Sequence, residues 1–148
     1  MFRHTVAFAL LLLLIPALGA AQPPRPSKSE YLTTEGAGFM LDKANGAIYA
    51  MTFSVNKEIK SPVFVTINFE NPSDRKSPFR SDLTIAPGQH DVMAESPGIK
   101  RIKSGKRYSV DVLLYADESR TLLIGRHSQK VAFDMPEEMA TAFGIETP

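Results

Sequence analysis

Apolar and polar residues alternate along much of the chain, most regularly over residues 106–115. Apolar side chains occupy the even positions from Tyr108 to Leu114, and the polar residues Ser109 and Asp111 lie between them. A side-chain period of two is typical of a β-strand with one face packed on a core. The pattern therefore predicts a half-buried strand here.

Other stretches repeat this pattern and are separated by Gly, Pro, Asn and Asp, the residues that favour turns. They predict further strands at residues 30–34, 38–42, 47–55, 63–71, 82–85, 90–95 and 121–133, with a glycine break at 36–38 between the first two. Seven or eight short strands with a turn signal about every ten residues predict an all-β fold, an antiparallel β-sandwich.

The last predicted strand changes phase part of the way along. Its apolar residues shift from the even positions Leu122 and Ile124 to the odd positions Val131 and Phe133. One extra residue must be absorbed between them, and we predict a β-bulge at Gly125 because glycine tolerates a positive φ.

The apolar residues near the C-terminus recur every four positions instead. Met135, Met139 and Phe143 share this spacing, and Pro136 suits the first turn of a helix. We therefore expect a short helix near 135–143, with these side chains covering one end of the core.

The N-terminus predicts export. Arg3 precedes an apolar run at residues 6–15 that is too short to span a bilayer, and small residues follow it. This arrangement indicates a secretory signal peptide, which we place at residues 1–21. Residues 22–29 are proline-rich and polar and predict an extended or disordered tether. A single domain, of ordinary size, then occupies 30–148.

Composition narrows the compartment and the partners. Cleavage of the leader removes one of 17 basic residues and none of 16 acidic residues, so the mature chain carries 16 of each. This neutral balance argues against nucleic acid as a partner. The chain has no cysteine, so we expect a hydrophobic core rather than disulfides to hold it, which fits a bacterial periplasm. We expect a periplasmic or secreted protein without a transmembrane segment after signal cleavage.

Catalysis finds no support in the sequence. It contains no nucleophile elbow, phosphate-binding loop or zinc-protease motif, and only His90 and His127 follow the leader. We expect a protein that is not an enzyme and that carries no cofactor.

One stretch resembles a known class of domain. Ile102-x-Ser104-Gly105-Lys106-x-Tyr108, followed by valine at every second position, has the spacing of Leu-x-Pro-Gly-Thr-x-Tyr before a core strand. In this it resembles the fibronectin type III and immunoglobulin-like β-sandwich domains. The resemblance implies a tyrosine corner, with Gly105 in the turn and Tyr108 buried, its hydroxyl bonded near Ser104. It implies no particular function.

Basic residues gather in two predicted loops and are the candidate partner-binding residues: Lys100, Arg101, Lys103, Lys106 and Arg107 in one, and Arg75, Lys76 and Arg80 in the other. If both loops emerge at the same end of the sandwich, they form a cationic patch for an acidic protein, a glycan or a lipid headgroup. The alternative is a solvated turn that keeps the domain soluble.

The two histidines of the mature chain fall on apolar strand faces. Both fit satisfied histidines near the ends of the sandwich. The alternative is a copper or zinc site, with Met93, Met40 or Met135 as soft ligands. That site would make the chain a periplasmic metal carrier using His90 and His127.

The leading hypothesis is a non-enzymatic, exported accessory domain of the bacterial cell envelope. It would bind an envelope protein or glycan through its loops or an exposed sheet edge. A pilus-assembly chaperone is less favoured, because those proteins resemble two linked sandwiches and this chain has room for one.

Overall fold

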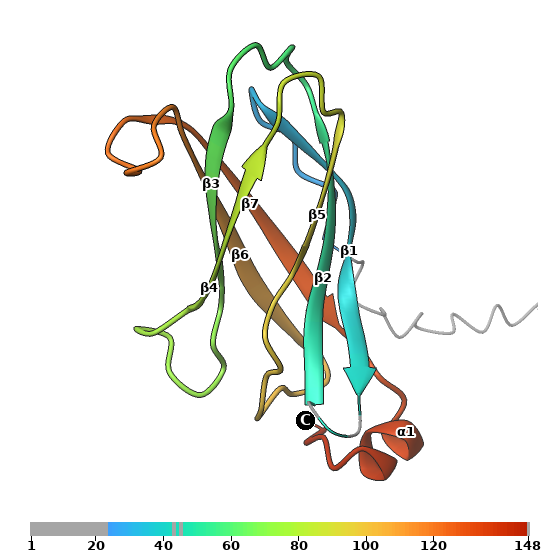
Figure 1. The fold of residues 1–148 in the computed structure, drawn as a ribbon. Helices are drawn as coiled ribbons and strands as arrows, with labels where there is room; N and C mark the ends of the chain where they lie inside the picture. The colour runs from blue at the N-terminus through green and yellow to red at the C-terminus, as the bar shows by residue number, and fades with distance from the viewer. Residues whose placement is uncertain (1–23, 43, 45, 148) are drawn as a thin grey trace, which may run out of the picture.

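Two antiparallel sheets and one short helix make up the described part of the chain (Figure 1). The computed structural model describes residues 24–147 except 43 and 45, so the predicted signal peptide lies outside the described residues. The strands are β1 Leu32–Asp42, β2 Gly46–Val55, β3 Val63–Phe69, β4 Phe79–Ile85, β5 Asp91–Glu95, β6 Lys106–Tyr115 and β7 Leu123–Phe133, and the helix is α1 Glu137–Ala142.

The sheets are stacked as a sandwich. One contains three strands in the order β1-β2-β5, and the other contains four in the order β4-β3-β6-β7. The chain crosses between the layers after β2, β4 and β5, whereas β1 and β2, β3 and β4, and β6 and β7 are neighbours within one sheet. The predicted antiparallel β-sandwich with a short C-terminal helix is confirmed, and its topology is compatible with the immunoglobulin-like resemblance.

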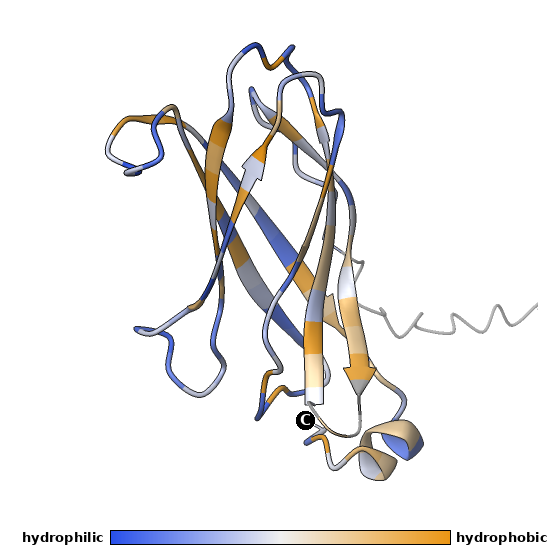
Figure 2. Cartoon of the chain, in the orientation of Figure 1, coloured by the Kyte–Doolittle hydropathy of each residue, from blue (hydrophilic) through white to orange (hydrophobic). Residues whose placement is uncertain are grey.

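The core lies between the sheets and is filled from the alternating positions. On β2, Tyr49, Met51 and Phe53 are at most 2% exposed, and on β6, Val110 and Leu114 are completely buried. Figure 2 shows the corresponding hydrophobic and hydrophilic bands along the strands. Burial of these side chains is the main stabilising contribution in a chain without cysteine.

The first strand is longer than predicted. Residues 32–42 form one strand, and the expected break at 36–38 is wrong. The pairing with β2 instead shifts by one residue between Thr34 and Gly36, which is a β-bulge. Pairing continues beyond it because Phe39 packs on the Tyr49 ring, with centroids 4.5 Å apart.

A bulge also interrupts β7, beside Gly125. Leu114 pairs with Gly125 and Tyr115 pairs with Leu123, so Ile124 is the extra residue. The physical reason differs from the predicted one, because Gly125 is not among the glycines with a positive φ. A Cβ at Gly125 would instead lie 2.7 Å from the Tyr31 ring. Glycine is needed here for the close approach of that ring.

The C-terminal helix is shorter than residues 135–143 and packs through a different side chain. Ala140 is its buried residue, whereas Met139 and Phe143 are 49% and 36% exposed. The expectation that Met139 and Phe143 cover the core is therefore wrong. Only Met135, which precedes the helix, packs against the core, and the Ser104 hydroxyl accepts its N–H at 2.8 Å.

The proline-rich segment is docked rather than free over its described part, residues 24–29. The Ser27 N–H donates to Gln129 Oε1 at 2.7 Å, and the Gln129 side chain donates to the Arg25 carbonyl at 3.1 Å. The Ser27 hydroxyl donates to the Ser128 carbonyl at 2.6 Å. Polar hydrogen bonds therefore fix a segment that has no apolar anchor, which corrects the expectation of a tether.

Candidate partner-binding surface

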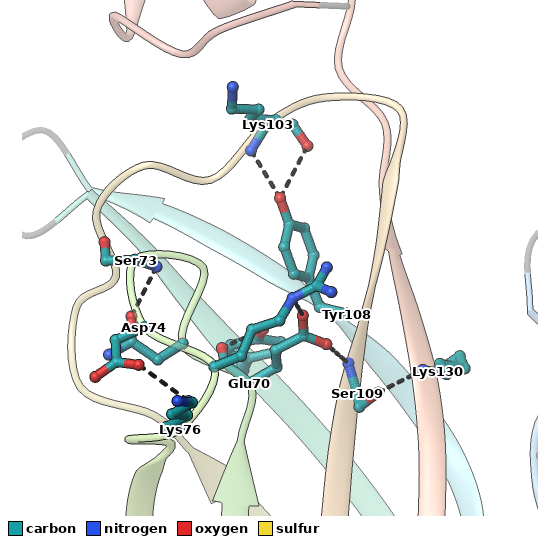
Figure 3. A network of polar contacts seen from close by, with 11 residues as sticks. Glu70, Ser73, Asp74, Lys76, Lys103, Tyr108, Ser109 and Lys130 are labelled. Atoms are coloured by element: carbon teal, nitrogen blue, oxygen red, sulfur yellow. Dashed lines mark hydrogen bonds and ion pairs between the residues drawn. The ribbon is translucent and has the colours of Figure 1, made fainter.

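The two loops that carry the predicted cations emerge at the same end of the sandwich. One follows β3 and the other precedes β6, and these strands are antiparallel neighbours with Phe69 opposite Val110. The end of β3 therefore lies beside the start of β6. Figure 3 shows Lys76 of the first loop and Lys103 of the second near the network around Glu70.

Tyr108 and Glu70 hold the two loops in place. Tyr108 is 5% exposed, and its hydroxyl accepts the Lys103 N–H at 2.9 Å and donates to the Lys103 carbonyl over 3.4 Å. This is the backbone contact expected of a tyrosine corner, one residue before the expected position. Burial raises the pKa of Tyr108. Glu70 accepts the Ser109 N–H at 2.8 Å and pairs with Arg75 at 3.1 Å.

The turn between the loop and β6 depends on a glycine. Gly105 has a φ of 74°, in the left-handed region that favours glycine. Its N–H donates to the Phe133 carbonyl at 2.8 Å, at the end of β7. The turn is thereby tied to the neighbouring strand.

Five exposed cations gather at this end, and we call them the loop-end surface: Arg75, Lys76, Lys103, Lys106 and Arg107. Arg75 keeps 83% of its side chain exposed although it pairs with Glu70. The Lys103 ammonium donates a hydrogen bond to the Glu146 carboxylate, which raises the pKa of Lys103. All five side chains are therefore exposed, but the charges of Arg75 and Lys103 are partly neutralised by their carboxylate partners.

A sixth cation joins them from a strand. Arg75, Arg107 and Lys130 line a hollow of 470 Å³, together with the acidic residues Glu70 and Asp111. Sequence reasoning missed Lys130 because it lies outside the loops. The register of β6 and β7 brings it into the hollow, since it stands opposite the serine at position 109.

Arg80 belongs to a different cluster. Its Nε lies 3.0 Å from Asp82 Oδ1, and its guanidinium donates to Thr66 Oγ1 at 3.3 Å. Arg120 also approaches Asp82, at 3.6 Å. Burial alone would raise the pKa of Asp82, but the hydrogen bonds from Arg80 and Thr66 outweigh it and lower that pKa. The structure therefore places Arg80 in an ion cluster on β3 and β4.

Lys100 and Arg101 line a separate cleft, which we call the C-terminal cleft. It has a volume of 530 Å³ and lies between the segment before β6 and the end of α1. Its remaining lining is mostly apolar. The eight predicted cations are thus divided among the loop-end surface, the C-terminal cleft and the Asp82 cluster.

The proposed metal ligands are not brought together. His127 is 3% exposed, its Nδ1 lies 3.0 Å from Ser29 Oγ, and its Nε2 lies 2.8 Å from Thr34 Oγ1. His90 is exposed, and Met93 is 73% exposed on β5. Among the described residues, no group of three or more His, Cys, Asp or Glu side chains could hold a metal ion.

Hydrogen bonds to the hydroxyls of Ser29 and Thr34 explain how the His127 ring is accommodated inside the sandwich. The Ser29 hydroxyl donates to the Leu32 carbonyl at 3.2 Å, so it accepts a hydrogen bond from the N–H at Nδ1. Thr34 then donates to Nε2. In this tautomer Nδ1 carries the proton and the lone pair of Nε2 accepts the Thr34 hydroxyl, so no ring lone pair is left for a metal. Burial lowers the pKa of His127, which favours this neutral form.

Comparison with known proteins adds little to this geometry. No protein family and no curated protein matches the chain. Among solved structures, the chain is similar to a beta-glucuronidase of Bacteroides uniformis, with a TM-score of 0.41 and 16% identity. The match covers 76% of this chain but only 12% of that enzyme's chain. The fold assignment therefore rests on the sheet topology, which is compatible with the immunoglobulin-like resemblance.

The described residues also bear on membrane association. No helix among them is long and apolar enough to cross a bilayer.

Proposed function

We propose that the chain is an exported, non-enzymatic accessory domain of the bacterial cell envelope that binds an acidic partner protein through the loop-end surface. The observation that carries the proposal is the convergence of two basic loops on one end of the sandwich. The β3–β6 pairing and the Tyr108 and Glu70 contacts hold that end in a defined shape.

Charge and rigidity together favour an acidic partner. Basic and acidic residues balance over the mature chain, so attraction of an acidic partner depends on a local excess of cations such as the one at this end. Anchored loops lose little conformational entropy on binding, which favours recognition by a preformed surface. Lys76 and Lys106 make no ion pair within the described part of the chain, so their charges are not neutralised internally.

The experiment is capture of partners from periplasmic extract with the purified protein at physiological salt. The Lys76→Glu/Lys106→Glu variant reverses two charges on the loop-end surface. Lys60→Glu/Lys57→Glu is the matched control, because these lysines lie between β2 and β3, at the opposite end of the sandwich. Lys57 pairs with Glu30, so the stability of both variants is checked by circular dichroism.

We expect the parent and the control to retain the same acidic protein and the loop variant to lose it. Raising the salt concentration should release the protein, because exposed charges are screened over about 10 Å at 0.1 M salt. Capture of nothing, or equal capture by the loop variant, would refute the proposal.

A further inference from the structure

We infer that the C-terminal cleft binds a carboxylate with an apolar chain. The chain would lie against Phe143 and Leu41, and the carboxylate would meet Lys100 and Arg101. This inference does not depend on the proposed acidic partner, because the cleft and the loop-end surface are formed by different residues.

The walls of the cleft are pinned by backbone hydrogen bonds. On one side, Ile99 donates to the Ala47 carbonyl at 2.7 Å and accepts the Ala47 N–H at 3.3 Å. Gly46 packs so closely here that a Cβ would lie 2.5 Å from the Ile99 carbonyl oxygen. On the other side, the Ser104 N–H donates to the Glu146 carbonyl at 3.1 Å. A preformed cleft of 530 Å³ is within the usual size range of small-molecule sites.

Apolar side chains make up a continuous part of the lining of the cleft. Ile99 and Ile102 form part of it and are 1% and 4% exposed. Leu41 and Ile145 are half-buried, and Phe143 leaves 36% of its surface in water. The hydration of the exposed part of the Phe143 side chain is unfavourable, and a hydrocarbon chain that covered this ring would remove it.

The charge of the cleft favours an anion. Lys100 and Arg101 both line it and are exposed. Glu146 is the acidic residue of the lining, but Lys103 pairs with it and lowers its pKa. The cleft therefore keeps an excess of positive charge, which complements a carboxylate.

The backbone conformation of Arg101 is a second indication that the cleft binds a ligand. Its φ is 61°, in the left-handed region that costs free energy for residues other than glycine. Arg120 has a comparable φ of 55°, but its side chain is held by Asp82. Arg101 forms no direct ion pair among the described residues, although its charge, together with that of Lys103, lowers the pKa of Glu146. Residues in sparsely populated backbone conformations cluster at ligand-binding sites, so this φ supports a ligand-facing role for Arg101.

The backbone of the cleft favours a fatty carboxylate over a peptide. The N–H groups of Gly144 and Ile145 donate to the carbonyls of Thr141 and Ala140 at 3.1 and 2.8 Å, and the N–H and carbonyl of Ile99 are paired as well. A peptide would bury its own N–H and C=O groups without partners, which is costly. A ligand with one charged end and an apolar chain has no such groups.

The test uses octanoate and two matched probes. 1-Octanol has the same chain without the charge, and butyrate keeps the charge on a shorter chain. Each is titrated into the ¹⁵N-labelled protein while the amide signals of Ile99, Arg101 and Ile145 are followed. We expect octanoate to saturate a single site at these signals. Butyrate and 1-octanol should each bind at least about tenfold more weakly than octanoate. For 1-octanol the reason is the loss of one charged hydrogen bond.

Arg101→Gly is the decisive variant, because glycine suits the backbone at this position and the fold should be retained. It should weaken octanoate binding about tenfold and leave 1-octanol binding unchanged. Lys76→Gly, on the loop-end surface, removes the same charge and should bind octanoate as the parent does. Absence of saturable shifts, equal affinity for octanoate and 1-octanol, or unchanged octanoate binding by Arg101→Gly would overturn the inference. Tighter binding of an apolar tripeptide at the same signals would also overturn it.

Discussion

Replacement of Tyr108 by phenylalanine isolates the hydrogen bond that anchors the second loop. The ring would keep its edge contacts with Phe39 and Tyr49, whose centroids lie 6.0 and 6.5 Å away. Only the hydroxyl is lost, and with it the acceptor of the Lys103 N–H at 2.9 Å. The donation to the Lys103 carbonyl is long, at 3.4 Å, and contributes little. The cost is that of one backbone N–H without its partner, about 1–2 kcal/mol.

Urea unfolding followed by circular dichroism measures this cost. The midpoint should fall while the slope with urea stays the same, and a thermal scan should show a decrease in Tm of roughly 3–8 °C. Tyr115→Phe is the matched control, because the Tyr115 hydroxyl makes no hydrogen bond within the described residues, and it should change stability by less than about 0.5 kcal/mol. Equal stability of the Tyr108→Phe variant and the parent would refute the tyrosine corner as an anchor of the loop.

Three further predictions concern the interior and the docked segment. Burial lowers the pKa of His127, so the unfolded chain binds a proton at higher pH than the folded chain. The stabilising contribution should then be full above the unfolded pKa of about 6.5 and should be lost as the pH falls through the folded pKa. As the pH is lowered, the urea midpoint should therefore decrease more steeply in the parent than in the His127→Gln variant. Parallel curves of urea midpoint against pH would contradict this. Gly125→Ala should cost about 1–3 kcal/mol through a clash with the Tyr31 ring 2.7 Å away, and addition of Tyr31→Ala should remove that coupling; additive losses in the double variant would argue against the clash. Ser27→Ala removes the donation to the Ser128 carbonyl, so it should cost about 1 kcal/mol and speed tryptic cleavage of the N-terminal segment; unchanged cleavage would count against docking.

Local alternation was sufficient to predict most strands. β2, β3 and β6 each bury every second side chain, so their faces can be recognised from sequence. The spacing from Ile102 to Tyr108 likewise predicted the corner turn, because the buried ring and the turn glycine lie close in sequence. The sequence alone could not place both basic loops at one end of the sandwich, because that placement depends on the pairing of β3 with β6.

Contacts between distant residues were not predictable from local patterns. The glycine at 36 suggested a break, but pairing with β2 on both sides of the bulge keeps β1 continuous. Ser27 docks through bonds to Ser128 and Gln129, about a hundred residues away, and polar anchors leave no apolar signal. Lys130 joins the hollow only through the β6–β7 register. In each case, tertiary pairing decides the outcome, and a single sequence does not display it.

Site-specific photo-crosslinking in living cells can establish whether the partner binds at the loop-end surface. A photoreactive amino acid is placed at Lys76 in one variant and at Lys60, at the opposite end of the sandwich, in the other. The account predicts a crosslinked product of one size, containing an acidic envelope protein, from position 76 and not from position 60. The same product from both positions, or a product from position 60 alone, would contradict it.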